Sequence, residues 1–124
     1  MCIRDRTNSA NHPPCTLEYY AEALKHFDDD RNVIVFSDDP VWCNEQELFS
    51  GDRFLISENE DNRVDLCLMT LCSDFIIANS SFSWWGAWLI DNPDKTVIAP
   101  KKWFGSQYDH YNMDDLIPEG WKVV

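Results

Sequence analysis

Short runs of apolar residues recur along the chain, and most of them end in polar residues. The runs are continuous rather than alternating, which is typical of parallel strands that helices cover on both faces. Polar segments with Gly, Pro, Asn or Asp separate the runs, as turns and loops do. We expect strands over residues 33–39, 53–57, 74–78 and 96–100.

Between these runs the apolar residues repeat at a helical period. The spacing predicts an amphipathic helix over residues 15–27, with Thr16 as its N-cap. Further helices are predicted over 40–49, where Pro40 suits the first turn, over 61–72 and over 83–90. The inward face of the first helix is expected to consist of Leu17, Tyr20, Ala21, Leu24 and Phe27. The expected inward residues of the third helix are Val64, Leu68 and Leu71.

The alternation of helix and strand predicts the fold class. Short connections between alternating elements favour an α/β domain, a Rossmann-like parallel sheet with helices on both faces. The first predicted element is a helix, whereas doubly wound domains normally begin with a strand, so we expect the first strand to be missing. We assign residues 1–14 to a poorly structured leader or scar and residues 15–124 to the domain. The tail from residue 101 is expected to be loop, with one helical turn around Met113–Leu116.

The charge balance argues against one large class of partner. The chain carries 22 acidic and 10 basic residues, a formal net charge of −12, and it has no basic stripe. Such a chain repels the phosphate backbone, so we do not expect nucleic-acid binding. A single phosphate-bearing ligand is compatible with this charge, provided that backbone amides or a few well-placed cations meet it.

The cysteine pattern predicts free thiols. The chain has five cysteines, and none are spaced as C-x-x-C, so a reducing compartment is favoured over a secreted disulfide framework. Cys67 and Cys72 lie in an apolar helical run, where we expect them to act as small hydrophobic residues. The three histidines are scattered, and no apolar run reaches membrane-spanning length. We therefore expect a cytoplasmic protein; peripheral membrane association, or the Golgi membrane in a eukaryote, is left open.

Polar residues follow three of the predicted strands and mark a candidate site. In an open parallel sheet, ligands bind outside the carboxyl ends of the strands. The stretch after the third strand also precedes a helix, so hydroxyls, free backbone N–H groups and the positive end of a helix dipole would meet there. These are the components of a diphosphate site. The residues after the three strands are Ser37, Asp38 and Asp39, then Asn79, Ser80, Ser81, Phe82 and Ser83, and finally Pro100, Lys101 and Lys102.

Each of these features also has a purely structural interpretation. Ser81 or Ser83 could cap the following helix, and an Asp pair before a proline is typical of a turn. The three tryptophans at residues 84–88 would most simply be core residues that pack their helix on the sheet. Asp65 lies within an apolar helix, where its carboxylate would either accept two hydrogen bonds from a guanine edge or simply face solvent.

Taken together, these segments resemble glycosyltransferase family 11, whose members include α-1,2-fucosyltransferases. The shared blocks cover residues from about 15 to 124 and are LEYYAEAL, VIVFSDDPVWC, DLCLMTLCSDFIIANSSFSWWGAWL, VIAPKKWF and IPEGW. The resemblance implies a GT-B-type architecture, of which this chain is the C-terminal, donor-binding half. It also implies inverting transfer of L-fucose from GDP-fucose to the 2-hydroxyl of a galactoside, such as a galactose-terminated glycan.

The resemblance implies roles for individual residues as well. Asp38 and Asp39 would face the nucleotide or sugar and supply a candidate catalytic base, and Asp65 would lie near the guanine. The tryptophans would wedge the preceding loop rigidly against the sheet. No metal or other cofactor is expected, because an isolated Asp pair is a weak metal signal. The residues implied at the donor diphosphate are Asn79, Ser80, Ser81 and Ser83, with Phe82 beside them.

One family motif is not found in this chain. The family carries an H-x-R-R-G-D-Y motif upstream of the LEYY helix, and its arginine is expected to neutralise the leaving diphosphate. The residues that precede the helix here are MCIRDRTNSANHPPC, in which Arg4 and Arg6 do not match that motif. We therefore expect a truncated chain. A catalytically inactive nucleotide-sugar-binding or interaction module, and a GT-B enzyme that uses another donor, are the alternatives.

Overall fold

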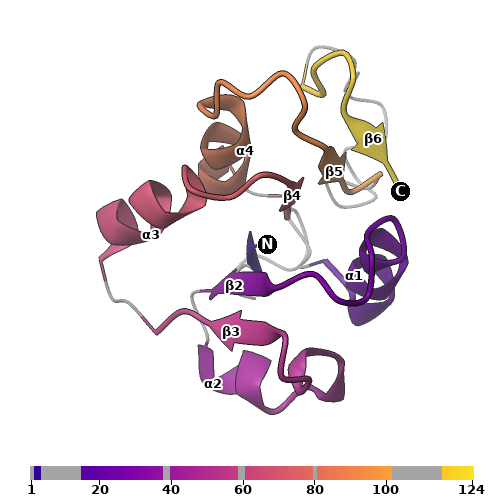
Figure 1. Cartoon of the computed structure of the whole chain (residues 1–124), viewed down its shortest axis with the longest axis vertical. Helices are drawn as coiled ribbons and strands as arrows, with labels where there is room; N and C mark the ends of the chain where they lie inside the picture. The colour runs from indigo at the N-terminus through magenta and orange to yellow at the C-terminus, as the bar shows by residue number, and fades with distance from the viewer. Residues whose placement is uncertain (1, 4–14, 38–39, 59–60, 80, 102–115) are drawn as a thin grey trace, which may run out of the picture.

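The computed structural model describes residues 2–3, 15–37, 40–58, 61–79, 81–101 and 116–124, apart from the side chains of residues 2, 3, 62 and 81. Over these residues strands and helices alternate along the chain (Figure 1), so the predicted α/β class is confirmed. Residues 4–14 of the predicted leader and most of the predicted turn at Met113–Leu116 lie outside the described residues, so both stay predictions.

The strands pair in parallel in two groups of three. One group has the order β1-β2-β3 and the other the order β4-β5-β6. Two of these strands, β1 (Cys2–Ile3) and β6 (Lys122–Val123), were not predicted. The predicted strands are all found, as β2 (Val33–Ser37), β3 (Phe54–Ile56), β4 (Phe75–Ile76) and β5 (Val97–Ala99).

The first described element is β1, so the expectation that the chain begins on a helix is wrong. Cys2 lies opposite Phe36 and Ile3 lies opposite Ser37 on β2. The apolar run that contains β1 is only three residues long and is followed by charged residues, which is why the pattern did not indicate a strand there. The same holds for β6, which pairs with β5 and makes part of the predicted loop tail a strand.

The predicted helices are confirmed with shorter bounds. The hydroxyl of Thr16 caps α1 (Leu17–Leu24), accepting a hydrogen bond of 3.1 Å from an amide in the first turn. The second predicted helix is split into α2 (Pro40–Asn44) and a 3-10 turn, η1 (Glu47–Phe49), because Gln46 between them has an extended backbone. The last two helices are α3 (Asn62–Met69) and α4 (Ser81–Trp88).

The inward face of α3 differs in part from the predicted one: Leu68 packs against buried residues as expected, but the other two predicted residues do not face inward. Val64 is 42 % exposed and Leu71, beyond the end of the helix, is 81 % exposed, whereas Asp65 and Met69 are buried. The reason is a contact between helices. Met69 packs so closely on α4 that a side chain at Gly86 would overlap it. This contact determines which face of α3 turns inward, and the apolar pattern of α3 alone does not contain it.

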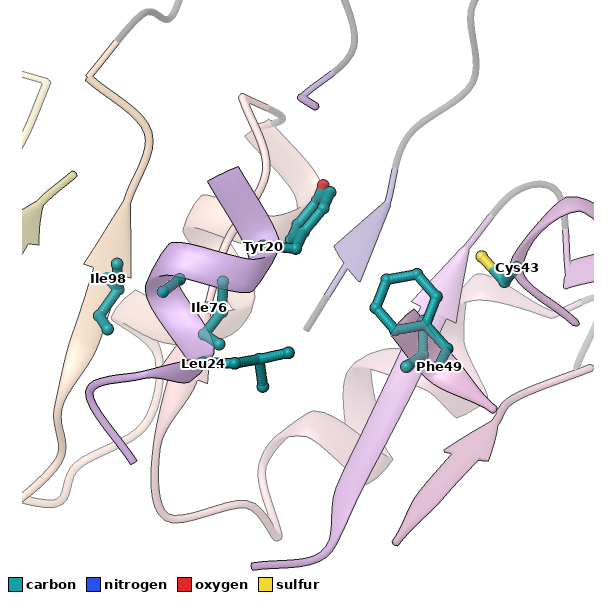
Figure 2. Packing of buried hydrophobic residues seen from close by; sticks show 8 residues of the cluster. Tyr20, Leu24, Cys43, Phe49, Ile76 and Ile98 are labelled. Atoms are coloured by element: carbon teal, nitrogen blue, oxygen red, sulfur yellow. The ribbon is translucent and has the colours of Figure 1, made fainter. Parts of the chain in front are cut away.

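Helices cover both faces of the strand layer. Successive strand side chains point to opposite faces, so each face carries apolar residues for a helix to pack on. One hydrophobic cluster contains residues of α1, α2 and η1, and Figure 2 shows its members as sticks. The other cluster lies beneath α3 and α4. Full burial of a leucine such as Leu24 contributes about 1.5–3 kcal/mol. The strand residues in the first cluster include Val35, Ile76 and Ile98. Those in the second are Phe36, Phe75, Val97 and Ala99, with Ile77 after β4.

The described cysteines form no disulfide bond, as the sequence predicted. Cys43 is buried and Cys72 is partly buried against the second cluster. Cys67 is exposed, so the prediction that it acts as a small hydrophobic residue is wrong, for the same reason as the inward face of α3. In the part of the chain that the structure describes, no helix has the length and apolar character needed to cross a bilayer.

Candidate functional site

Polar residues gather at the edge of the strand layer where the strands end. The strands within each group are parallel, and Figure 2 shows the arrows of β1, β2 and β5 pointing the same way. Ser37 ends β2, Asn79 follows β4 and Lys101 follows β5. The remaining predicted residues of this edge, Asp38, Asp39, Ser80 and Lys102, lie outside the described residues, so their roles stay predictions.

Asn79 is completely buried at this edge. The thiol of Cys15, just before α1, donates a hydrogen bond of 3.4 Å to the Asn79 side-chain oxygen. Burial raises the pKa of the Cys15 thiol, so that the group stays protonated and remains a donor. A residue 64 positions away in the sequence therefore fixes the orientation of the Asn79 amide.

A tyrosine hydroxyl stabilises the backbone at the same edge. Tyr19 of α1 donates to the carbonyl oxygen of Ile77 at 2.6 Å and lies 3.2 Å from that of Ile98. Since the Ile77 amide bonds to the Ile98 carbonyl, the next donor in a parallel ladder would be the amide of residue 100. Residue 100 is Pro100, which has no N–H, so the Tyr19 hydroxyl takes its place. Burial raises the pKa of Tyr19 well above its ordinary value, which keeps the hydroxyl protonated.

The first turn of α4 contains a buried hydroxyl without a partner. Ser83 is fully buried, and its Oγ has no hydrogen-bond partner among the residues that the structure describes. The interpretation of Ser83 as a helix cap is therefore wrong, because a cap accepts a hydrogen bond from a backbone amide. Phe82 packs against the second hydrophobic cluster, and the side chain of Ser81 lies outside the described residues.

Asp65 points inward from the first turn of α3. It is 6 % exposed, so the interpretation as a solvent-facing residue is wrong. Its Oδ1 accepts a hydrogen bond of 2.9 Å from the hydroxyl of Ser57, the residue after β3. The carboxylate is thus held at the same edge of the strand layer as the other polar residues. At the start of the helix, Arg63 bonds to exposed Asp61 and lowers the pKa of that carboxyl.

The predictions that the tryptophans of α4 are core residues and wedge the loop against the sheet are wrong for Trp85 and Trp88, whereas Trp84 is partly buried and packs against the second hydrophobic cluster. Trp85 and Trp88 are about half exposed. The indole N–H of Trp84 donates to the Leu116 carbonyl at 2.6 Å, and its ring stacks on that of Trp88. Small side chains face inward instead, because α4 approaches its neighbours closely. The buried residues of the segment are Ser83, Gly86, Ala87 and Ile90.

Sequence reasoning missed three residues that hold this site. Ser57 follows a predicted strand, so the rule used for the other strand ends could have indicated it. Cys15 and Tyr19 left no such signal, because their contacts join α1 to strands far along the chain. Within the described ranges no three metal-ligating side chains come together. The acidic pair at residues 38–39 lies outside those ranges, so the absence of a metal stays a prediction.

Comparison with known proteins matches residues 3–124 to the family described as Glycosyl transferase family 11. The chain is 38 % identical over 112 residues to the O-antigen biosynthesis glycosyltransferase WbnK of Escherichia coli, covering 86 % of this chain and 37 % of that protein. It is 40 % identical over 116 residues to an alpha-1,2-colitosyltransferase of Escherichia coli, covering 89 % of this chain and 39 % of that protein. The chain thus spans less than two fifths of the length of these relatives. No solved structure gives a significant match.

Proposed function

Because the chain belongs to glycosyl transferase family 11, we propose that it is the donor-binding part of an enzyme that transfers L-fucose from GDP-fucose. The acceptor is the 2-hydroxyl of a galactoside, and the transfer inverts the configuration at the anomeric carbon. Two relatives named as glycosyltransferases support the general reaction. The α-1,2 linkage in the name of one of them supports attack by a 2-hydroxyl.

The observation that carries the proposal is the buried hydroxyl of Ser83, which has no hydrogen-bond partner among the described residues. Leaving a buried hydroxyl without a partner costs about 1–3 kcal/mol, so a native fold rarely keeps one without a reason. A phosphate oxygen of the donor would satisfy it. The first turn of a helix also presents backbone N–H groups and a positive dipole end, which favour an anion. The chain has a net charge of −12 and repels anions overall, so a diphosphate can bind only where local groups such as these attract it.

The same groups assist the departure of GDP. As the glycosidic bond to the donor breaks, negative charge grows on the diphosphate, and donors already in position stabilise it without reorganising. Asn79, held by Cys15, and Ser83 are such donors, and Lys101 follows the neighbouring strand at the same edge. Asp38 or Asp39 is the proposed base that accepts the proton of the acceptor hydroxyl.

Asp65 is the proposed partner of the guanine base. Guanine presents two adjacent N–H donors, and a carboxylate can accept both. The hydrogen bond from Ser57 fixes the orientation of the Asp65 carboxylate before the base arrives. Uracil lacks this pair of adjacent donors, so the same carboxylate would select GDP over UDP.

Two finer points concern which sugar is transferred and whether the protein is catalytically active. Colitose, the sugar in the name of one relative, lacks one hydroxyl group that L-fucose has, so family membership is compatible with either sugar. A catalytically inactive nucleotide-sugar-binding or interaction module remains the second candidate, because the acidic pair at 38–39 lies outside the described residues. An assay for transfer of labelled fucose to a galactoside separates the enzyme from the inactive module.

Calorimetric titration with GDP and with UDP tests donor binding. We expect saturable binding of GDP and at least tenfold weaker binding of UDP. Ser83→Ala should weaken GDP binding by about tenfold or more, since a hydrogen bond to a charged group contributes about 1.5–3 kcal/mol. Asp65→Asn should reduce the preference for GDP over UDP. The amide N–H group of the new side chain would face one of the guanine N–H groups, and two donors cannot hydrogen-bond to each other.

Ser50→Ala is the matched control for the serine variant. Ser50 is exposed, and within the described part of the chain its hydroxyl donates locally, to the Glu47 carbonyl at 2.6 Å. GDP should bind this variant as tightly as the native chain. Equal binding of GDP and UDP by a folded chain, or an unchanged affinity in Ser83→Ala, would contradict the proposed donor site.

A further inference from the structure

The pairing of β5 with β6 continues beyond the end of β5 to Lys101. The Val124 amide donates to the Ala99 carbonyl at 3.1 Å, and the Lys101 amide donates to the Val124 carbonyl at 2.9 Å. Side chains alternate along a strand, so Lys101 is on the same face as Ala99, which belongs to the hydrophobic cluster beneath α3 and α4. Lys101 is thus placed on the face of the strand layer on which α4 carries Ser83.

The pairing of β4 with β5 places Lys101 beside Asn79. Ile76 lies opposite Ile98, and the Ile77 amide continues this pairing by donating to the Ile98 carbonyl at 2.9 Å. The same register, continued by three residues, sets Lys101 opposite Asn79. Neighbouring strands are only about 4.8 Å apart, so the long, flexible side chain of Lys101 can extend over Asn79 toward the start of α4.

The ammonium group of Lys101 has no ion-pair or hydrogen-bond partner among the described residues. Other cations next to the strand layer are engaged within the protein. Arg31 forms an ion pair of 2.6 Å with Asp74, and Lys95 donates to two carbonyl groups near the end of α4. Lys101 is exposed, so its charge is available to a ligand at this edge.

Groups of opposite charge lie at the two sides of the carboxyl edge. Asp65 is held by Ser57, which follows β3, whereas Lys101 follows β5. Figure 1 shows β2 and β4 between these two strands. A nucleotide has a hydrogen-bonding base at one end and anionic phosphates at the other. With its guanine at Asp65, its phosphates extend toward Lys101, because the carboxylate repels them and the ammonium group attracts them.

We propose that Lys101 binds the β-phosphate of the donor and makes the site selective for a nucleoside diphosphate over a monophosphate. This inference rests on the proposed function, which places a diphosphate at the first turn of α4. Asn79 and Ser83 are neutral, whereas the ammonium group brings a full positive charge to a chain of net charge −12. Hydrogen bonds in which both partners are charged are roughly twice as strong as those between neutral groups.

The same contact assists the transfer. The bond between the anomeric carbon and the β-phosphate oxygen breaks, and its electron pair stays on that oxygen. The oxygen of the acceptor hydroxyl forms the new bond to the anomeric carbon, and its proton goes to the proposed base. Lys101 transfers no proton in this step. Its ammonium group stabilises the negative charge that the departing β-phosphate gains.

Calorimetric titration of the chain with GDP and with GMP tests the proposal, because the two ligands differ by the β-phosphate. We expect the native chain to bind GDP more tightly than GMP by about tenfold or more, the factor that one hydrogen bond to a charged group contributes. Lys101→Ala should remove this preference and leave the affinity for GMP nearly unchanged. Lys101→Arg should keep the preference, since a guanidinium group also binds phosphate. Both variants retain the backbone bonds of residue 101, and their melting temperatures should equal that of the native chain.

Lys122→Ala is the matched control, because it changes the net charge by the same amount. Lys122 is also exposed, and its position opposite Ile98 sets it three residues, about 10 Å, away from the level of Lys101 along the strands. This variant should keep the preference for GDP.

Three results would overturn the role of Lys101 while leaving the donor site in place. They are equal affinities of the native chain for GDP and GMP, an unchanged preference in Lys101→Ala, and an equal loss of preference in Lys122→Ala. Failure of the folded native chain to bind either nucleotide would overturn both this inference and the proposed function.

Discussion

Replacing Tyr19 with phenylalanine removes the hydroxyl that supports the candidate site from below. The Ile77 carbonyl, in a residue only 1 % exposed, would lose its donor, and the described residues provide no other. Leaving such a group unsatisfied costs about 1–3 kcal/mol. The Ile98 carbonyl is affected less, because it also accepts from the Ile77 amide. We therefore expect Tyr19→Phe to lower the free energy of unfolding by about 1–3 kcal/mol, measured by urea denaturation.

The explanation for this hydroxyl makes a sharper prediction about Pro100. Pro100→Ala restores the amide that a parallel ladder would aim at the Ile77 carbonyl. Alone, this change should cost about 0.4–1 kcal/mol, because the unfolded chain gains freedom. Combined with Tyr19→Phe, it should recover about 1 kcal/mol relative to the sum of the single changes. Strict additivity of the two changes, or a Tyr19→Phe effect below about 0.5 kcal/mol, would refute the role assigned to the hydroxyl.

Three further predictions concern other contacts of the described residues. Trp84→Phe loses the hydrogen bond to the C-terminal segment and should cost about 1 kcal/mol in urea denaturation, whereas Trp85→Phe, half exposed, should change little. Gly86→Val should lower the free energy of unfolding by about 1–3 kcal/mol, because the added side chain overpacks against α3. A decrease below about 0.5 kcal/mol would contradict that contact. Because burial raises the pKa of Cys15, its contribution is present below its unfolded pKa of about 8.5 and declines as the pH rises above that value. Cys15→Ala should flatten the fall in stability above this pH, measured by urea denaturation at a series of pH values.

Much of the fold could be predicted from the sequence because buried parallel strands leave continuous apolar runs. All the runs chosen on this basis are strands, from β2 to β5. β1 and β6 leave no such pattern, because charged residues follow or interrupt the few apolar residues around them, and both are identified by pairing with a neighbouring strand. The inward face of α3 was misjudged for a related reason. It depends on how closely Met69 approaches Gly86, a contact between helices that periodicity does not encode.

In the candidate site, too, some residues could be predicted from the sequence and others could not. Asn79 and Ser83 were identified because polar residues after a buried strand fall at the ligand-binding edge of a parallel sheet. Asp65 was singled out by its position in an apolar helix, but that position suits either burial or exposure, and only the family resemblance favoured a place near the guanine. Tyr19 was missed because the need for it arises from a proline on a distant strand. Trp85 and Trp88 were misjudged because size alone suggested burial, whereas the close approach of α4 to its neighbours requires small side chains there.

A crystal structure of this chain with GDP would test the proposed donor site most directly. We expect a diphosphate oxygen within about 3 Å of the Ser83 hydroxyl, at the first turn of α4. The guanine edge should meet the Asp65 carboxylate while Ser57 keeps its bond to it. GDP bound elsewhere, with Ser83 still unpartnered, would contradict the assignment of this edge as the donor site.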